Sequence, residues 1–358
     1  MSVVGDLTRE RIEAMVREID PTAEVRDATP ATPGHHLVVH LTVTAESLPT
    51  AVVLKATPPG ASPSCGAEAR MLQLVDAHTE LPVPTLQGVV DTAPEYPTPY
   101  FLASSVPGAR DDRTVLREWS DEDVASLARS TGAHLATLHE LDALDGYGYV
   151  TVESARELEG GRPAVDREQL VVETPESTWR EYLAAERERI LPGLADTRFA
   201  DLQDPLGPVL DAAIEALTGP FEPVIARVDH SLGNVVVDPD SKRVRGLLDW
   251  EFCVAATPAY DLAFVEHSLV GGPWGLLPAA PDHRQTIREA MCEGYATAGS
   301  PAVVEQFRTN RSCYDLLADV HAMLNLEGWF ETVDVVEGTE AQRSAVASAL
   351  RDCVTRRV

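Results

Sequence analysis

The sequence predicts an α+β protein with two lobes, a small β-rich lobe followed by a larger, mostly α-helical one. Short apolar runs of strand type crowd into about the first hundred residues, whereas amphipathic helical patterns dominate from residue 121 onward. A chain of 358 residues is long enough for two sizeable cores. We therefore expect an N-terminal lobe over 1–106 and a C-terminal lobe over 107–358.

The N-terminal lobe should begin with a helix and continue with several strands. Residues 7–19 place Ile12, Met15, Val16 and Ile19 at helical spacing. A second helical pattern surrounds Glu68. Strands are predicted at 36–43, 51–56, 86–90 and 99–104.

The C-terminal lobe should be a set of helices around one hairpin. A helix is predicted over 121–141, with acidic residues in its first turn. Residues 150–176 are polar and acidic, which indicates a loop or insertion. Further helices are expected around Trp179 to Ile190 and over 206–217, 284–297, 302–309 and 312–330.

The hairpin carries polar residues at its base. Val235–Val237 and Val244–Leu248 flank the turn-forming Pro239-Asp240-Ser241. With Asp240 to Arg243 as the loop, Pro239 would face Val244.

Counting outward from that pairing places Asn234 opposite Asp249, and Asp229 lies one short turn upstream. Clustered carboxylate and amide oxygens suit Mg²⁺, which completes its coordination with phosphate and water. The alternative is that each of these residues has only a local role, because a lone Asp or Asn is more often a turn residue or the cap of a strand end.

Lysine is scarce in this chain, so its position is informative. Lys55 and Lys242 are the two lysines, and Lys55 lies in the apolar run 51–56. A half-buried lysine needs a partner. Glu68, thirteen residues later in a helical pattern, is the candidate. The alternative is a surface lysine and a solvated glutamate.

Together these residues resemble the kinase catalytic machinery. Asp229 and Asn234 have the spacing of a kinase catalytic loop, and Asp249 follows a hairpin like the metal-binding aspartate. Asp249-Trp250-Glu251 and then Tyr260-Asp261-Leu262-Ala263 are similar to the aminoglycoside phosphotransferase and choline kinase family. The resemblance implies a bilobal protein-kinase-like fold that uses ATP and Mg²⁺.

The resemblance also implies roles for individual residues. Asp229 would be catalytic, orienting the acceptor hydroxyl and taking its proton, and Asn234 and Asp249 would hold Mg²⁺. Lys55, positioned by Glu68, would contact the nucleotide phosphates. The remaining implied positions are Ser104 and Val106, whose carbonyl and amide would meet the adenine, Gly34 in a phosphate-covering loop, and Asp261, which would either stabilise the catalytic loop or cap its own helix.

The chain departs from the family pattern next to the catalytic aspartate. Arg227-Val228 replaces the usual His-Gly, and Ser231-Leu232 replaces His-Pro. The missing histidine normally braces the loop. His230 could contact substrate or only cap the turn, and His139 is expected to be a packed structural histidine.

Charge and composition limit the partners. The formal net charge is −28, which resembles proteins of salt-loving organisms and disfavours nucleic acid as a partner. The five cysteines are scattered and lack metal-ligand spacing, so neither a zinc site nor a disulfide framework is expected. No apolar run approaches the length of a membrane span and no signal peptide is evident. We therefore expect a cytoplasmic protein, a monomer or homodimer, with a halophilic surface.

The resulting prediction is an ATP-dependent kinase acting on a hydroxyl of a small molecule. A kinase fold that has lost catalysis and serves as a binding or regulatory protein is the alternative, motivated by Arg227-Val228. A metal-dependent hydrolase would give Lys55 and Glu68 no task. The acceptor is not determined, and fold alone does not identify it. The candidate pocket residues are Trp274, Tyr314, Glu327 and Trp329, which could equally belong to the core.

Overall fold

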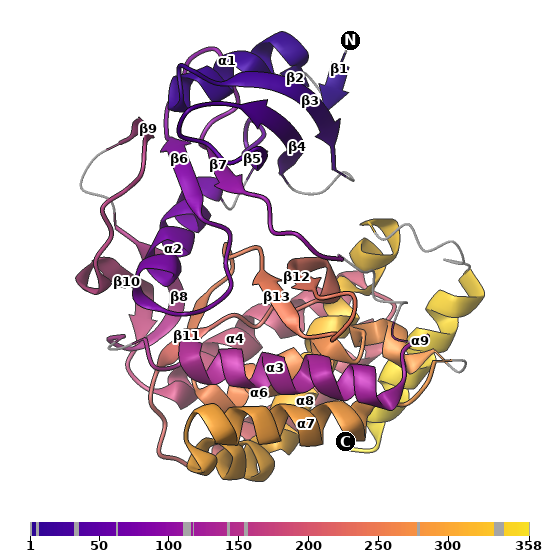
Figure 1. The fold of residues 1–358 in the computed structure, drawn as a ribbon. Coiled ribbons are helices and arrows are strands. Elements are labelled where there is room, and N and C mark those ends of the chain that lie inside the picture. Colours follow the sequence, from indigo (N-terminus) through magenta and orange to yellow (C-terminus); the bar gives the residue numbers. More distant parts are fainter. Residues whose placement is uncertain are drawn as a thin grey trace. The chain divides into compact units, whose positions relative to one another are not determined.

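The computed structural model describes the chain apart from residues 1, 5–6, 32–35, 62–63, 110–115, 117, 142–143, 154–156, 278–279, 333–339 and 358. It forms two compact units. Unit 1 comprises Met1–Pro107, Thr151–Val171 and Gly246–Glu251, and unit 2 comprises Gly108–Val150, Val172–Arg245 and Phe252–Val358. Two segments beyond residue 107 therefore belong to unit 1. The β-rich first part and helical second part confirm the predicted α+β class (Figure 1).

Unit 1 is built on a six-stranded sheet in the order β3-β4-β5-β7-β6-β9. All neighbouring strands in it are antiparallel. The strands are β3 (Glu24–Pro30), β4 (Leu37–Thr44), β5 (Ala51–Ala56), β6 (Leu86–Val90), β7 (Tyr100–Ser104) and β9 (Glu159–Gly161), and β1 (Ser2–Val4) pairs separately with β2 (Leu7–Thr8). β3 was not predicted. The prediction of a loop over 150–176 is wrong, because this segment contributes β9, the whole of the strand at 170–176 and the end of the strand at 147–152.

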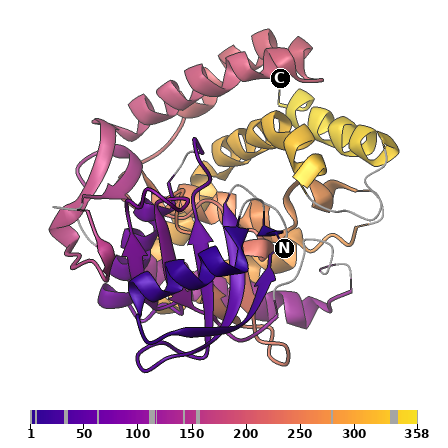
Figure 2. The ribbon, with the colours of Figure 1, turned by 90° about the horizontal axis from the view of Figure 1, so that it is seen from above.

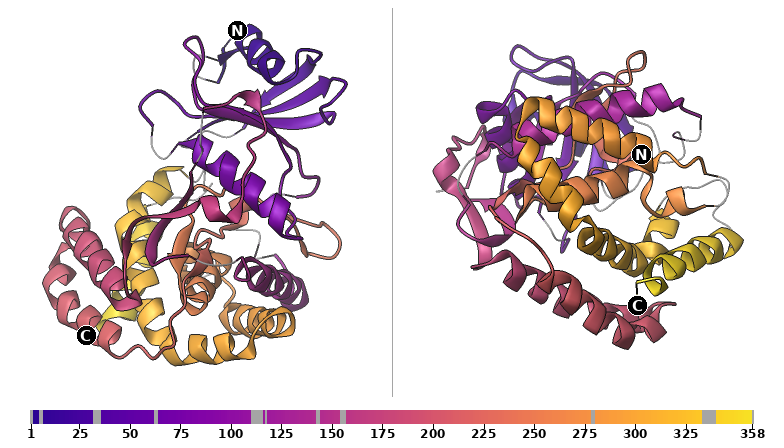
Figure 3. Two further views of the ribbon diagram at one scale, coloured as in Figure 1. Left: turned by 90° about the vertical axis from the view of Figure 1, so that its left-hand side faces the viewer. Right: turned by 90° about the horizontal axis from the view of Figure 1, so that it is seen from below.

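Two helices complete unit 1. α1 (Arg9–Ile19) begins after Thr8, whose hydroxyl accepts a hydrogen bond from the Arg11 amide. Its apolar stripe joins one core cluster with alternate residues of the sheet strands. The helix lies next to the sheet in the left view of Figure 3. α2 (Cys65–His78) is capped by Ser64 and carries Glu68 in its first turn.

Unit 2 contains a four-stranded sheet in the order β10-β8-β14-β11. Its strands are β8 (Tyr147–Val152), β10 (Leu170–Glu176), β11 (Val224–Ala226) and β14 (Val254–Ala256). The predicted hairpin is confirmed as the pair of β12 (Val235–Val237) and β13 (Val244–Leu247).

The predicted register of this hairpin is wrong. The Asp238 amide donates to the Arg243 carbonyl, and the Lys242 amide donates to the Asp238 carbonyl. Lys242 adopts a positive φ of 57°, which closes the turn one residue earlier than expected. The prediction that Asn234 lies opposite Asp249 assumed that Pro239 faces Val244. Because that pairing is not observed, the hairpin register no longer supports the prediction.

Helices form most of unit 2. They are α3 (Asp121–Leu138), α4 (Trp179–Gly193), α5 (Gln203–Glu215), α6 (Pro258–Leu269), α7 (Arg284–Ala298), α8 (Pro301–Thr332) and α9 (Glu340–Thr355). α3 and α7 lie side by side (Figures 1 and 3). Their close approach requires Gly132, because a Cβ there would lie 2.0 Å from the Met291 carbonyl oxygen. α8 and α9, orange-yellow and yellow in Figure 2, also pack together.

The C-terminal helices differ from the prediction. One helix, α8, replaces the two expected at 302–309 and 312–330, and α9 was not predicted. The polar Asn310 does not interrupt α8, because its side chain exchanges two hydrogen bonds with the Thr218 backbone. Within the described part of the chain, no helix is long and apolar enough to cross a membrane.

Candidate active site

Lys55 and Glu68 are brought together in unit 1, as the sequence predicted. Alternate residues of β5 face the core, so Lys55 projects from the opposite face of the strand. Its Nζ lies 2.6 Å from Oε2 of Glu68, and the Lys55 side chain is only 12% exposed. Removing one partner of such a buried pair typically costs about 3–5 kcal/mol.

Two further carboxylates surround the same ammonium. Lys55 Nζ donates to Oδ1 of Asp249 at 3.2 Å, and Oε2 of Glu251 lies 3.9 Å away. Glu251 is itself bonded to Nε2 of the buried His36. Oxygen atoms of Glu68, Asp249 and Glu251 all lie within 4.8 Å of one another. Neither Glu251 nor His36 was predicted to be a site residue, although Glu251 belongs to the Asp-Trp-Glu motif.

The ionisation of this cluster follows from burial and charge. Burial alone lowers the Lys55 pKa, but Glu68, Asp249 and Glu251 together outweigh it, so that pKa is raised and the ammonium stays charged. Burial, together with the negative charges of Asp249 and Glu251, raises the pKa of Glu68 to about 7 against the opposing effect of Lys55. One ammonium thus faces three carboxyl groups, which favours an additional cation.

The turn at residues 227–229 of unit 2 holds Asp229 next to a strained backbone. Val228 adopts φ +48°, where a β-branched residue is an outlier. The Asp229 amide donates to the Arg227 carbonyl at 2.5 Å, which closes a three-residue turn. Asp229 is exposed, and its Oδ2 accepts a hydrogen bond from Asn234 Nδ2 at 3.2 Å. The predicted neighbours Asp229 and Asn234 therefore meet.

Asp261 braces this turn from α6. Its Oδ1 accepts from the Val228 amide at 2.8 Å, and its Oδ2 lies 3.0 Å from His139 Nε2. His139 Nδ1 in turn lies 2.9 Å from the Tyr295 hydroxyl. Thr257 caps α6, so the capping alternative for Asp261 is wrong and the bracing prediction is confirmed. His139 is structural, as expected.

Arg227 and His230 occupy the space behind the turn. Arg227 Nη1 donates to His230 Nδ1 at 3.2 Å, and His230 Nε2 lies 3.5 Å from the Thr131 hydroxyl. Both side chains are buried. Burial lowers the His230 pKa well below its usual value, with Arg227 and His134 adding to the effect. His230 is therefore neutral and points inward, and the suggested contact with substrate is wrong.

Ser104, whose carbonyl was predicted to meet the adenine, ends β7. Its amide donates to the Thr85 carbonyl, and its hydroxyl accepts from the Thr85 amide. Val106 follows in an irregular segment. Gly34, the candidate for a phosphate-covering loop, lies outside the described residues.

The candidate pocket residues of the C-terminal helices have separate environments. Tyr314 belongs to the core, where its hydroxyl accepts from Trp179 Nε1 at 3.0 Å. Glu327 is paired with Arg198 and Arg343. Trp329 lies half-buried beside His321. The side chain of Trp274 lies outside the described residues.

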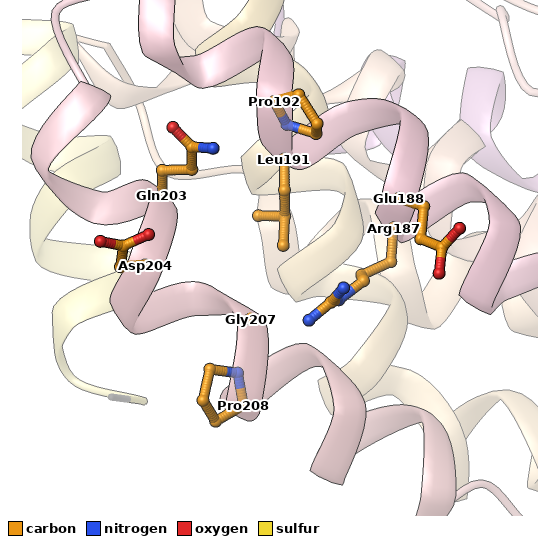
Figure 4. Close-up of a pocket in the computed structure, with 8 residues that line it drawn as sticks. All are labelled: Arg187, Glu188, Leu191, Pro192, Gln203, Asp204, Gly207 and Pro208. Carbon is orange, nitrogen blue, oxygen red and sulfur yellow. The ribbon is translucent and has the colours of Figure 1, made fainter.

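A separate hollow of about 340 Å³ lies between α4 and α5 (Figure 4). Arg187, Glu188, Gln203 and Asp204 contribute to its lining. Arg187 is paired with Asp211 at 3.1 Å. The hollow contains none of the predicted site residues.

Comparison with known proteins places the chain in a family. The model of the phosphotransferase enzyme family matches residues 28–280. The chain belongs to the phosphotransferase enzyme family. Membership confirms the predicted class of activity, transfer of phosphate from ATP to a hydroxyl of a small molecule. No curated protein sequence matched the chain.

Solved structures confirm the kinase-like fold. Aminoglycoside phosphotransferase APH(2'')-IIIa, solved with GDP and kanamycin, is 11% identical with a TM-score of 0.58, covering 97% of this chain and 99% of that one. A putative aminoglycoside phosphotransferase from Ralstonia eutropha is 13% identical, with a TM-score of 0.57 and coverage of 98% and 97%. A mutant of APH(4)-Ia, solved with AMP-PNP and hygromycin B, is 14% identical, with a TM-score of 0.53 and coverage of 95% and 98%. At these identities the likeness concerns the fold alone.

Proposed function

We propose that this phosphotransferase moves the γ-phosphate of Mg²⁺–ATP to the hydroxyl of a small molecule, and that Asp229 is the catalytic residue. Asp229 is exposed, and its carboxylate is held by the Asn234 amide and by a turn that Asp261 braces. A carboxylate fixed in this way can orient a hydroxyl and accept its proton as the new bond forms.

The nucleotide would be held by Lys55 and by the strand end at Ser104. Lys55 stays charged and is oriented by Glu68, so it can contact phosphate oxygens without reorganising. The Ser104 carbonyl and the Val106 amide are the groups proposed to meet the adenine.

Asn234 and Asp249 would hold Mg²⁺. Their donor set fits a hard cation, since both offer oxygen. The amide nitrogen of Asn234 is used by Asp229, which leaves its oxygen for the metal, and the Asp249 side chain is 31% exposed. When bound, Mg²⁺ neutralises charge on the phosphates. The excess of carboxylates around Lys55 supports this assignment.

The observation that carries the proposal is the single ammonium of Lys55 within bonding distance of both Glu68 and Asp249. A surface lysine needs no buried partner, and a structural ion pair between Lys55 and Glu68 would not need the half-exposed Asp249 as a third member. A nucleotide-binding site explains all three residues.

The test combines calorimetric titration with ATP and Mg²⁺ in molar salt and mass detection of phosphorylated acceptors. We expect Asp229→Asn to bind ATP normally but to lose transfer by a factor of about 10²–10⁴, which is the usual contribution of a positioned base. Asp240→Asn, a change of an exposed aspartate in the β12–β13 turn, is the matched control and should keep full turnover. Unchanged transfer in Asp229→Asn contradicts the assignment. Nucleotide binding without transfer to any acceptor, with a co-purifying protein, favours the binding-protein alternative.

The remaining predictions extend this proposal. We place the enzyme in the cytoplasm as a monomer or homodimer. The acidic composition, −28 in formal charge, supports a halophilic environment.

A further inference from the structure

The sheet of unit 2 ends in two exposed aromatic side chains near the catalytic turn. Tyr149 is 46% exposed and Phe252 is 41% exposed. β11, β14 and β8 align Ala226 with Val254 and Val254 with Tyr149. The chain leaves β11 toward Asp229 and enters β14 from Phe252. Because the strands are antiparallel, Asp229, Phe252 and Tyr149 lie at the same end of the sheet.

A second group of rings lies on α6 and α8 of the same unit. His321 is an exposed residue whose ring packs against Phe264 and Trp329, with ring centroids 6.2 Å away in each case. Phe264 lies against Tyr260 at 4.3 Å. Crowding by protein lowers the His321 pKa, and Arg189 lowers it further, so the ring is uncharged at neutral pH.

The two groups of rings share charged neighbours. Arg189 of α4 interacts electrostatically with Tyr149 and with His321, and the charge of Asp229 also acts on His321. The other carboxylate acting on His321 is Glu186, which accepts two hydrogen bonds from Arg189, at 3.0 and 2.6 Å. The charges of Glu186 and Arg189 therefore neutralise each other. Asp229 therefore lies at the end of the sheet that carries Phe252 and Tyr149, and it is the one of the two carboxylates acting on His321 that Arg189 does not neutralise.

Such surroundings select against a polycation. Recognition of several ammonium groups requires several unneutralised carboxylates. Aromatic faces instead bind flat, uncharged groups by stacking, which contributes modestly but selectively.

We propose that the phosphate acceptor is an uncharged hydroxyl compound with an aromatic or similarly flat apolar ring, which packs on Phe252 and the neighbouring rings. This inference rests on the proposed function of Asp229. The acceptor oxygen forms a bond to the γ-phosphorus while the bond from that phosphorus to the β-phosphate bridging oxygen breaks. The hydroxyl proton passes to Asp229, and ADP leaves.

The first experiment measures binding without turnover. Asp229→Asn is titrated in molar salt with phenyl β-glucoside, methyl β-glucoside and kanamycin, and binding is followed by saturation-transfer NMR. The two glucosides carry the same sugar hydroxyls and differ only in the aglycone, which is a phenyl ring in one and a methyl group in the other. Kanamycin is a polycation. We expect phenyl β-glucoside to bind roughly three- to tenfold more tightly than methyl β-glucoside. Kanamycin should bind most weakly.

The second experiment locates the ring. Phe252→Ala should abolish the preference for the phenyl compound and leave ATP affinity unchanged. Phe221→Ala is the matched control. Phe221 is a half-exposed aromatic residue that precedes β11, at the opposite end of the sheet from Asp229, and it should keep the preference.

Several outcomes overturn the inference. They are equal or undetectable binding of the two glucosides, binding of kanamycin as tight as that of phenyl β-glucoside, and an intact preference in Phe252→Ala. Failure of the proposed function is distinguishable, because it appears as a wild-type protein that binds the phenyl compound with the expected preference but transfers no phosphate to it from ATP.

Discussion

The Asp261 brace provides the sharpest test of how this fold positions Asp229, the proposed catalytic aspartate. Asp261 is fully buried and accepts hydrogen bonds from the Val228 amide and from His139. Asp261→Ala would leave two buried donors without an acceptor. Each unsatisfied donor costs about 1–3 kcal/mol. We therefore expect a loss of about 3–5 kcal/mol in the free energy of unfolding of unit 2.

Asp261→Asn should behave quite differently. The amide oxygen can still accept from Val228. If the His139 proton moves to Nδ1 and is donated to the Tyr295 hydroxyl, His139 Nε2 can accept from the new amide nitrogen. The loss is then the difference between a charge-assisted and a neutral hydrogen bond, about 1 kcal/mol.

Thermal unfolding and steady-state kinetics measured in the same molar salt provide the assay. The alanine variant should unfold about 10 °C below wild type and the asparagine variant about 3 °C below. Turnover should fall further in the alanine variant, because the Val228 turn that carries Asp229 loses its anchor. Asp204→Ala, which removes an exposed first-turn aspartate of α5, serves as the control and should shift stability by less than 1 kcal/mol, as expected for the helix dipole. Equal effects of the alanine and asparagine changes would refute the reasoning.

Three further predictions follow from the same structure. The pKa of Glu68 in the folded protein is raised to about 7, above its usual value of 4.5. Wild type should therefore lose stability relative to Glu68→Gln as the pH rises from about 4.5 to 7. A difference in melting temperature that does not change with pH, measured with chelator and without nucleotide, would contradict this. Val228→Gly removes about 1–2 kcal/mol of left-handed backbone strain but adds an entropic cost of folding of about 0.5–1 kcal/mol. Denaturant titration should therefore find a free energy of unfolding within about 1 kcal/mol of wild type. A loss above about 2 kcal/mol would show that the Val228 side chain contributes more to stability than the turn conformation costs. From the −28 charge we expect loss of structure at low salt; a far-UV signal and melting temperature indifferent to salt between roughly 0.1 and 2 M would argue against a halophilic surface.

Several elements were predictable from sequence because their signals are local. The stripe of Ile12, Met15 and Val16 predicted α1 to within two residues, since helical spacing is independent of distant contacts. The two valine-rich runs predicted the hairpin, but not its register, which depends on the left-handed conformation of Lys242. The single helix α8 was missed because the packing of Asn310 against a remote backbone overrides its local propensity.

The sequence by itself determined the family and indicated five candidate site residues, because their types and spacings along the chain resemble those that phosphate transfer requires. Only the tertiary structure decided how those residues are supported. His36 and Glu251 meet across 215 positions of sequence, and Arg227 pairs with His230 behind the turn where the family usually has a histidine. Such pairings arise from the way strands and helices are stacked, and no local pattern records which distant side chain will share a buried space.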